Sequence, residues 1–354
     1  IIEYIMRCLT KAQLLAHIAE QLDEATATRI DHHLSSCPSC LATFVEVGKN
    51  PLIPQVDGYH VVREIGRGRF GVVYKAWRLG DHPSPVALKI LSDPGDMQVS
   101  RFDREIAVLK RLESPRIVRC IDSGKCGDLI YLVMDYVSGV HLDAFNKKKR
   151  LPLEERLRVF QRICGAVGDA HVAGVIHRDL KPKNILVDSE SEPHILDFGI
   201  CMVEQEDWSG LISETITHAG DIIGTLKYMS PEQAWGGGVT GHIDSRTDIW
   251  SLGVMLYEIV TDGGYPYPDD RYRDRPRHEA LLEQIRKDLP DQPDLSHLPR
   301  GKDLETLVER CLAWERDCRI NSAQDLADDV GRYLNGEEIA TQPLLFRHRV
   351  RRLA

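Results

Sequence analysis

The chain has 354 residues, and its 54 acidic and 45 basic side chains give a formal net charge of −9. Its 42% hydrophobic and 28% charged residues are typical of a soluble globular chain with a packed core, which excludes intrinsic disorder and collagen-like repeats. The acidic balance argues against nucleic acid as a partner, because phosphate binding needs a concentrated basic surface. No apolar run approaches the roughly 18 residues that span a bilayer, and the first residues lack a secretory signal.

The N-terminal residues 1–47 carry a helical pattern and a cluster of metal-ligand residue types. His33, Cys37 and Cys40 form an H-x-x-x-C-x-x-C pattern, which places three ligands around one point. A tetrahedral zinc site needs a fourth ligand, and Cys8 lies upstream of the amphipathic run. The segment resembles the zinc-binding fold of bacterial anti-sigma factors, which implies a small helical domain with a structural Zn²⁺ and a regulatory protein partner.

Other interpretations of this cluster stay open at the level of sequence. His17 and His32 are alternative ligands, although the spacing of His32 to Cys37 does not fit one helical turn. Cys37 and Cys40 could instead form a thiol–disulfide switch, or be free thiols at a helix end.

Residues 48–57 contain Pro51 and Pro54 and are predicted to be a linker, because closely spaced prolines stop both helices and central strands. Beyond it, β-branched runs predict strands over 61–66, 71–79 and 85–91. A first long helical pattern covers 101–112, and helices dominate after Leu153. A mostly-strand half followed by a mostly-helical half predicts an α+β architecture.

Residues 66–73 contain a glycine loop, G-x-G-x-x-G, formed by Gly66, Gly68 and Gly71. Glycines let backbone N–H groups approach phosphate oxygens, but this pattern alone also fits a dinucleotide site or a plain turn. Strand-like residues on both sides indicate a hairpin, whereas a dinucleotide fold needs a helix after the loop. Lys89 follows in an apolar strand, where a lysine could also simply extend to the surface.

The later motifs decide between these alternatives. Residues 176–184 read IHRDLKPKN and residues 195–199 read ILDFG. Together with the glycine loop and V-A-L-K, they have the order and spacing of protein kinase motifs. The sequence resembles bacterial serine/threonine protein kinases of the eukaryotic-like type. The resemblance implies an α+β, two-lobed protein kinase fold over 58–335, with an antiparallel sheet and helix C in the N-lobe and a mostly helical C-lobe, followed by a basic tail over 336–354.

The resemblance also implies catalytic roles. Lys89 would hold the α- and β-phosphates of ATP, and Glu105 would be its ion-pair partner, with Asp103 as the competing candidate. Asp179 would accept the proton of the substrate hydroxyl. Lys181 is the serine/threonine form of this loop, and its position implies protein substrates with Ser or Thr.

Cofactor binding is implied in the same way. Asn184 and Asp197 would hold Mg²⁺ (or Mn²⁺), since carboxylate and amide oxygens are the hard ligands that these ions prefer. Met134 would be the gatekeeper of the adenine slot, with base contacts from backbone groups of the next residues. The implied ATP-binding residues are Ile65, Gly66, Gly68, Gly71, Val73, Ala87, Lys89, Met134, Asp135 and Val137.

Residues 224–232, GTLKYMSPE, resemble the segment of bacterial serine/threonine kinases that replaces A-P-E. In such kinases a helix aspartate, here Asp248, braces the catalytic loop, and an arginine, here Arg319, pairs with the glutamate, here Glu232. The polar stretch before this segment contains Thr215 and Thr217, either of which is an autophosphorylation candidate because Arg178 could bind the added phosphate.

The leading prediction is therefore a serine/threonine protein kinase, with a pseudokinase scaffold or an anti-sigma-like regulator as alternatives. Autophosphorylation implies a transient homodimer. In similar kinases a basic run such as 345–354 precedes a membrane helix or a sensor region, so we expect a cytoplasmic chain, or the cytoplasmic part of a longer membrane-anchored protein. We also expect residues 57–354 to be active without the zinc segment, since all nucleotide motifs follow the linker.

Overall fold

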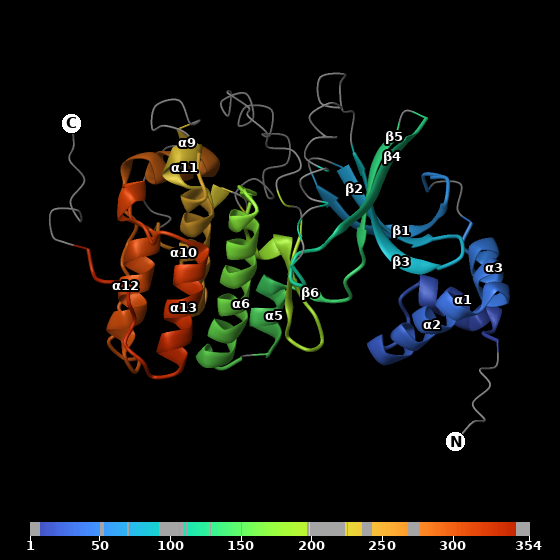
Figure 1. Ribbon diagram of the computed structural model, residues 1–354, viewed down its shortest axis with the longest axis horizontal. Helices are drawn as coiled ribbons and strands as arrows, with labels where there is room; N and C mark the ends of the chain where they lie inside the picture. The colour runs from blue at the N-terminus through green and yellow to red at the C-terminus, as the bar shows by residue number, and fades with distance from the viewer. Residues whose placement is uncertain are drawn as a thin grey trace. The chain divides into compact units, whose positions relative to one another are not determined.

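The structure is a computed structural model, shown in Figure 1. The chain divides into two compact units: residues 1–110 with 118–137, and residues 111–117 with 138–354. The structure describes residues 8–49, 53–68, 71–91, 106, 110, 112, 114–127, 129–149, 151–196, 198, 224, 226–235, 243–267 and 276–344.

Three short helices open the first unit: α1 (Lys11–Ile18), α2 (Glu24–Ser36) and α3 (Pro38–Val47). Thr10 and Gln13 form a capping box at the start of α1, and Asp23 caps α2 by accepting a bond from the amide of Thr26. Cys37 ends α2 and precedes Pro38, the first residue of α3. The helical pattern predicted for this segment is therefore confirmed, with the C-x-x-C motif at a tight turn between two helices.

The rest of the first unit is an antiparallel sheet of five strands in the order β1-β2-β3-β5-β4. The three predicted strands are confirmed as the first three strands of the sheet. The predicted helix over 101–112 lies mostly outside the described residues. The strand bounds are β1 (Tyr59–Gly68), β2 (Gly71–Arg78), β3 (Ser84–Leu91), β4 (Cys120–Cys126) and β5 (Leu129–Asp135).

The helices and the sheet share one hydrophobic core within this unit. Leu14, Leu34 and Phe44 from the helices pack with Val62 of β1 and Trp77 of β2. Phe44 contacts Trp77 edge-on, with ring centroids 5.8 Å apart, and the Trp77 side chain is fully buried. A second cluster, which includes Val61, fills the opposite face of the sheet. Residues 8–47 therefore cover the part of the first sheet face around Val62 and Trp77.

The expectation that residues 57–354 are active alone stays a prediction, and this shared core bears on it. Removing the helices would expose Trp77 and Val62, and an indole is among the largest apolar groups that a core can bury. The zinc segment is thus a structural part of the first unit.

The second unit is mostly helical, as the sequence predicted. Its central helix, α10, is buried along nearly its whole length, and Gly253 lets it approach Cys311 and Leu312 closely.

Among the described residues, no helix is both long and apolar enough to cross a membrane. The elements are β6 (Val140–His141), α5 (Leu142–Lys149), α6 (Leu153–Val172), η1 (Pro182–Asn184), β7 (Ile185–Val187), β8 (Pro193–Ile195), α9 (Pro231–Ala234), α10 (Arg246–Val260), α11 (Arg277–Lys287), α12 (Gly301–Cys311), η3 (Arg316–Cys318) and α13 (Ala323–Leu334).

Candidate active site and candidate zinc site

The loop between α6 and β7 brings together three of the predicted catalytic and metal-binding residues. The Lys181 ammonium donates to both carboxylate oxygens of Asp179, at 3.1 and 2.9 Å. The Asn184 amide nitrogen donates to the Asp179 backbone carbonyl at 2.7 Å and to its Oδ2 at 3.1 Å. These bonds hold the carboxylate from two sides, and they use the amide nitrogen of Asn184, so its predicted role in cation binding falls to its oxygen.

Asp248, near the N-terminal end of α10, holds this loop by binding the loop's backbone amides with its side chain. Its carboxylate is fully buried and accepts bonds from the amides of His177 and Arg178, at 2.8 and 2.9 Å, and from the His171 ring at 2.8 Å. Burial alone would raise the pKa of Asp248, but the bonds from His171 and His177 outweigh it, so the pKa lies below its ordinary value. The predicted contact between Asp248 and the catalytic loop is confirmed. Arg178 adopts the strained left-handed conformation, with φ 65°.

A buried ion pair anchors the segment after residue 229. Arg319 bonds both oxygens of Glu232 at 2.7 and 2.8 Å, and both side chains are at least 98% buried. Burial would raise the pKa of Glu232, but the Arg319 guanidinium outweighs it and lowers the pKa. Gln233 next to it donates to the Arg178 carbonyl at 2.7 Å. The predicted Glu232–Arg319 pair is confirmed, and Gln233 is a link to the catalytic loop that the sequence analysis missed.

In the first unit, the sheet register brings the predicted nucleotide residues onto neighbouring strands. Lys89 in β3 lies between Val73 of β2 and Leu132 of β5, and Ala87 pairs with Met134. Lys89 and Met134 are both more than 90% buried.

The three glycines of the glycine loop lie in the paired strands β1 and β2, where Gly68 pairs with Gly71. Gly71 has φ 142°, and a Cβ there would lie 2.0 Å from the Ile90 carbonyl oxygen, so glycine is required by the close approach of β3. A Cβ at Gly66 or Gly68 would meet nothing within 4 Å in the described part of the chain. Glycine at these two positions is therefore not explained by packing, and it leaves open space where phosphates would approach the backbone. Ile65 precedes the loop and is 37% exposed.

Residues 135–137 end the first unit. The amide of Asp135 donates to the Arg119 carbonyl at 3.1 Å, so a role of Asp135 in binding a base falls to its carbonyl oxygen. Glu105 and Asp197, and the candidates Thr215 and Thr217, lie outside the described residues. Their predicted roles remain predictions.

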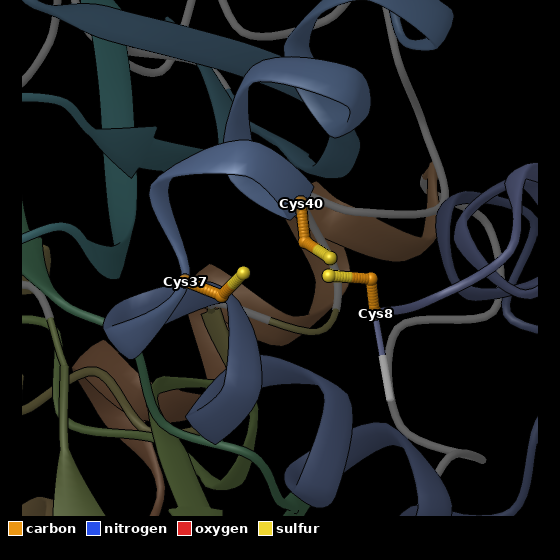
Figure 2. Close-up of side chains that lie close together, drawn as sticks. All are labelled: Cys8, Cys37 and Cys40. Atoms are coloured by element: carbon orange, nitrogen blue, oxygen red, sulfur yellow. The ribbon is translucent and has the colours of Figure 1, made fainter. Parts of the chain in front are cut away.

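The second cluster lies in the helices of the first unit, where Figure 2 shows Cys8, Cys37 and Cys40 pointing toward one point. Their sulfur atoms all lie within 4.8 Å of one another. The predicted fourth ligand, Cys8, thus lies in this cluster, whereas the predicted ligand His33 lies beside it, with its Nε2 3.2 Å from the Cys40 sulfur. Four-coordinate zinc with Zn–S bonds of about 2.3 Å would hold sulfurs roughly 3.8 Å apart, so the three cysteines fit this metal.

Two further observations bear on the ligand set. His17, one of the two alternative ligands, bonds Asp31 instead, with its Nε2 2.8 Å from a carboxylate oxygen. Burial raises the pKa of the Cys40 thiol to about 11, whereas a bond from the Cys40 amide lowers the pKa of Cys37. An apolar site that buries a thiol needs a positive charge to favour its thiolate, which is what a zinc ion supplies.

Comparison with known proteins agrees with both sites. The family described as "Protein kinase domain" matches residues 59–330, and the chain belongs to this family. The family described as "Putative zinc-finger" matches residues 10–41. The antiparallel sheet and the helical second unit are the two lobes of the protein kinase fold.

Several curated bacterial kinases are similar to the chain. The serine/threonine-protein kinase PknB of Mycobacterium tuberculosis is 33% identical over 291 residues, which is 79% of this chain and 44% of that protein. A probable serine/threonine-protein kinase of Clostridium perfringens is 33% identical over 276 residues, 77% of this chain and 38% of that protein. The serine/threonine-protein kinase pkn2 of Myxococcus xanthus is 33% identical over 285 residues, 77% of this chain and 32% of that protein. The chain thus spans less than half the length of these relatives.

Proposed function

We propose that the chain transfers the γ-phosphoryl group of ATP to serine or threonine hydroxyls of protein substrates. The observation that carries this proposal is the Asp179 carboxylate held by Lys181 and Asn184 on a loop that Asp248 braces. The presence of Lys89, Asp179 and Asp197 in the sequence favours an active enzyme over a pseudokinase scaffold.

The chemistry follows from these positions. Asp179 accepts the proton of the substrate hydroxyl as its O–H bond breaks. The hydroxyl oxygen bonds to the γ-phosphorus, the bond from that phosphorus to the β,γ-bridging oxygen breaks, and ADP leaves. Lys181 keeps the Asp179 carboxylate oriented, and Lys89 positions the phosphates. A divalent cation at Asn184 and Asp197 would supply neutralisation of the phosphate charge.

Label transfer from [γ-³²P]ATP to a generic protein tests this function. Lys89→Met should lower the rate about 100-fold or more, because positioning and electrostatics supply most of the catalysis of phosphoryl transfer. Lys125→Met removes an exposed lysine of β4 and should leave the rate unchanged. Equal rates in the two variants would contradict the role of Lys89.

We further propose that Cys8, His33, Cys37 and Cys40 bind one structural zinc ion. Purified protein should then contain about one zinc per chain, and Cys37→Ser should release it and unfold the small helices, since metal binding and folding are coupled in such segments. Cys318→Ser, far along the sequence in η3, is the matched control and should keep the metal. Elemental analysis beside a thiol titration measures both. Protein without zinc but with an oxidisable Cys37–Cys40 pair would favour the redox switch.

Regulation and location are part of the same proposal. Autophosphorylation at Thr215 or Thr217, through a transient homodimer, is supported by Arg178 next to Asp179, because an arginine at this position can bind the new phosphate. The zinc-finger match supports a regulatory protein partner. The kinase resemblance supports a cytoplasmic location, either free or attached to a membrane segment of a longer protein.

A further inference from the structure

The zinc-finger segment (residues 8–47) contacts the sheet through polar groups as well as through the shared core. Asp31 of α2 is central to the first contact. One of its oxygens lies 2.8 Å from the His17 ring nitrogen and the other 3.4 Å from the Lys75 ammonium of β2. Lys75 is 9% exposed, and its ammonium lies 4.6 Å from the centroid of the Tyr136 ring. This first polar bridge therefore runs from α2 through β2 to Tyr136.

A second polar contact joins the zinc-finger segment to β1. Glu20, between α1 and α2, forms an ion pair with Arg63 of β1. The positive charge of Arg63 also acts on the Tyr136 hydroxyl and lowers its pKa, although burial outweighs this and raises the pKa above its ordinary value. The zinc-finger segment thus pairs with one cation of β1 and one of β2, and the charges of both act on Tyr136.

These contacts bear on nucleotide binding because of where Tyr136 lies in the chain. It lies between Asp135 and Val137, whose backbone groups are the predicted contacts of the adenine base, and the first unit ends at residue 137. A ring held by the Lys75 ammonium restricts the backbone on both sides of it. Small displacements of the groups that position a substrate weaken its binding or slow its reaction, because these groups must already have the right geometry when the substrate binds.

We propose that the zinc-finger segment sets the nucleotide affinity of its own kinase domain, with Asp31 as a positioning residue that acts through Lys75 on Tyr136. This inference rests on the proposed kinase function. Asp31 does not touch the nucleotide in this scheme; it keeps the Lys75 ammonium against the ring.

Electrostatics explains why Asp31 matters. Lys75 is buried between the helices and the sheet, and a desolvated ammonium stays in place only when an opposite charge lies close to it. Asp31 supplies that charge. If the Asp31 carboxylate were neutralised, the Lys75 ammonium would have no negative charge beside it. Lys75 would then turn toward water and leave the ring of Tyr136.

The test compares Asp31→Asn with Glu46→Gln, which removes an exposed carboxylate of α3. Asp31→Asn should raise the KM for ATP and the Kd for a fluorescent ATP analogue about five- to tenfold, a usual range for coupling between sites. The kcat should stay within about twofold, and zinc content should equal that of the parent. Glu46→Gln should change none of these quantities. An unchanged KM and Kd in folded Asp31→Asn would overturn the inference.

A double-mutant cycle separates positioning from a general loss of stability. Lys75→Met should raise the KM for ATP to a similar degree, and Asp31→Asn should add little in the Lys75→Met background, because the two residues act in one bridge. Additive effects would show that Asp31 acts by another route and would overturn the inference. If the parent chain itself transfers no phosphate, the proposed function fails; a parent that is active with unaltered KM in the variants refutes the positioning role alone.

Discussion

Replacing Asp179 by asparagine should lower kcat by about 10³-fold, within the range that general-base residues contribute. Asparagine keeps the size of the side chain but cannot take the proton of the attacking hydroxyl. The loop should keep its conformation, because the bonds to Asp248 come from the amides of His177 and Arg178 and do not involve the Asp179 side chain.

Initial rates of label transfer measure this effect, with thermal melting and titration of a fluorescent ATP analogue to verify the fold and the nucleotide site. Glu190→Gln removes an exposed carboxylate of the same unit and serves as the control. If Asp179→Asn retained more than about a tenth of the parent rate, a general-base role of Asp179 would be excluded.

The second large effect concerns stability. Arg319→Met should lower the free energy of unfolding by about 3–5 kcal/mol, because it leaves the Glu232 carboxylate buried without its partner. The pKa of Glu232 is lowered in the folded chain, so the pair contributes stability above the ordinary pKa of a glutamate and loses it as the pH falls through the lower folded value.

Urea denaturation at neutral pH measures this loss. Lys287→Met, which breaks a surface pair with Glu283, should cost less than about 1 kcal/mol. The double variant Glu232→Leu/Arg319→Met should recover part of the lost stability, since it removes both charges from the interior. An Arg319→Met protein as stable as the Lys287→Met protein would contradict the structural role of the pair.

The kinase features were predictable because they depend on local sequence. The motif around Asp179 fixes residue types at short spacings, and β-branched runs mark the strands that carry Gly71 and Lys89. The contacts of Asp248 and Arg319 followed from the family resemblance, which records pairings between positions far apart in the sequence.

The docking of the zinc-finger segment was not predictable from these patterns. The linker prolines suggested separate domains, and nothing local to Asp31 indicates a partner in β2. In the structure, Lys75, Ala76 and Trp77 are buried in succession. Successive residues of a strand point to opposite faces of the sheet, so both faces are covered there. The sequence shows three apolar or amphipathic residues in a row there, but only the tertiary structure shows what covers the second face.

Phosphoamino-acid analysis of a generic protein labelled by the parent chain tests the central claim most directly. The chain with [γ-³²P]ATP and Mg²⁺ should produce phosphoserine or phosphothreonine, and the Asp179→Asn chain should produce about 10³-fold less of either. Label found only on tyrosine, or equal labelling by parent and variant, would contradict the assignment of this chain as a serine/threonine protein kinase.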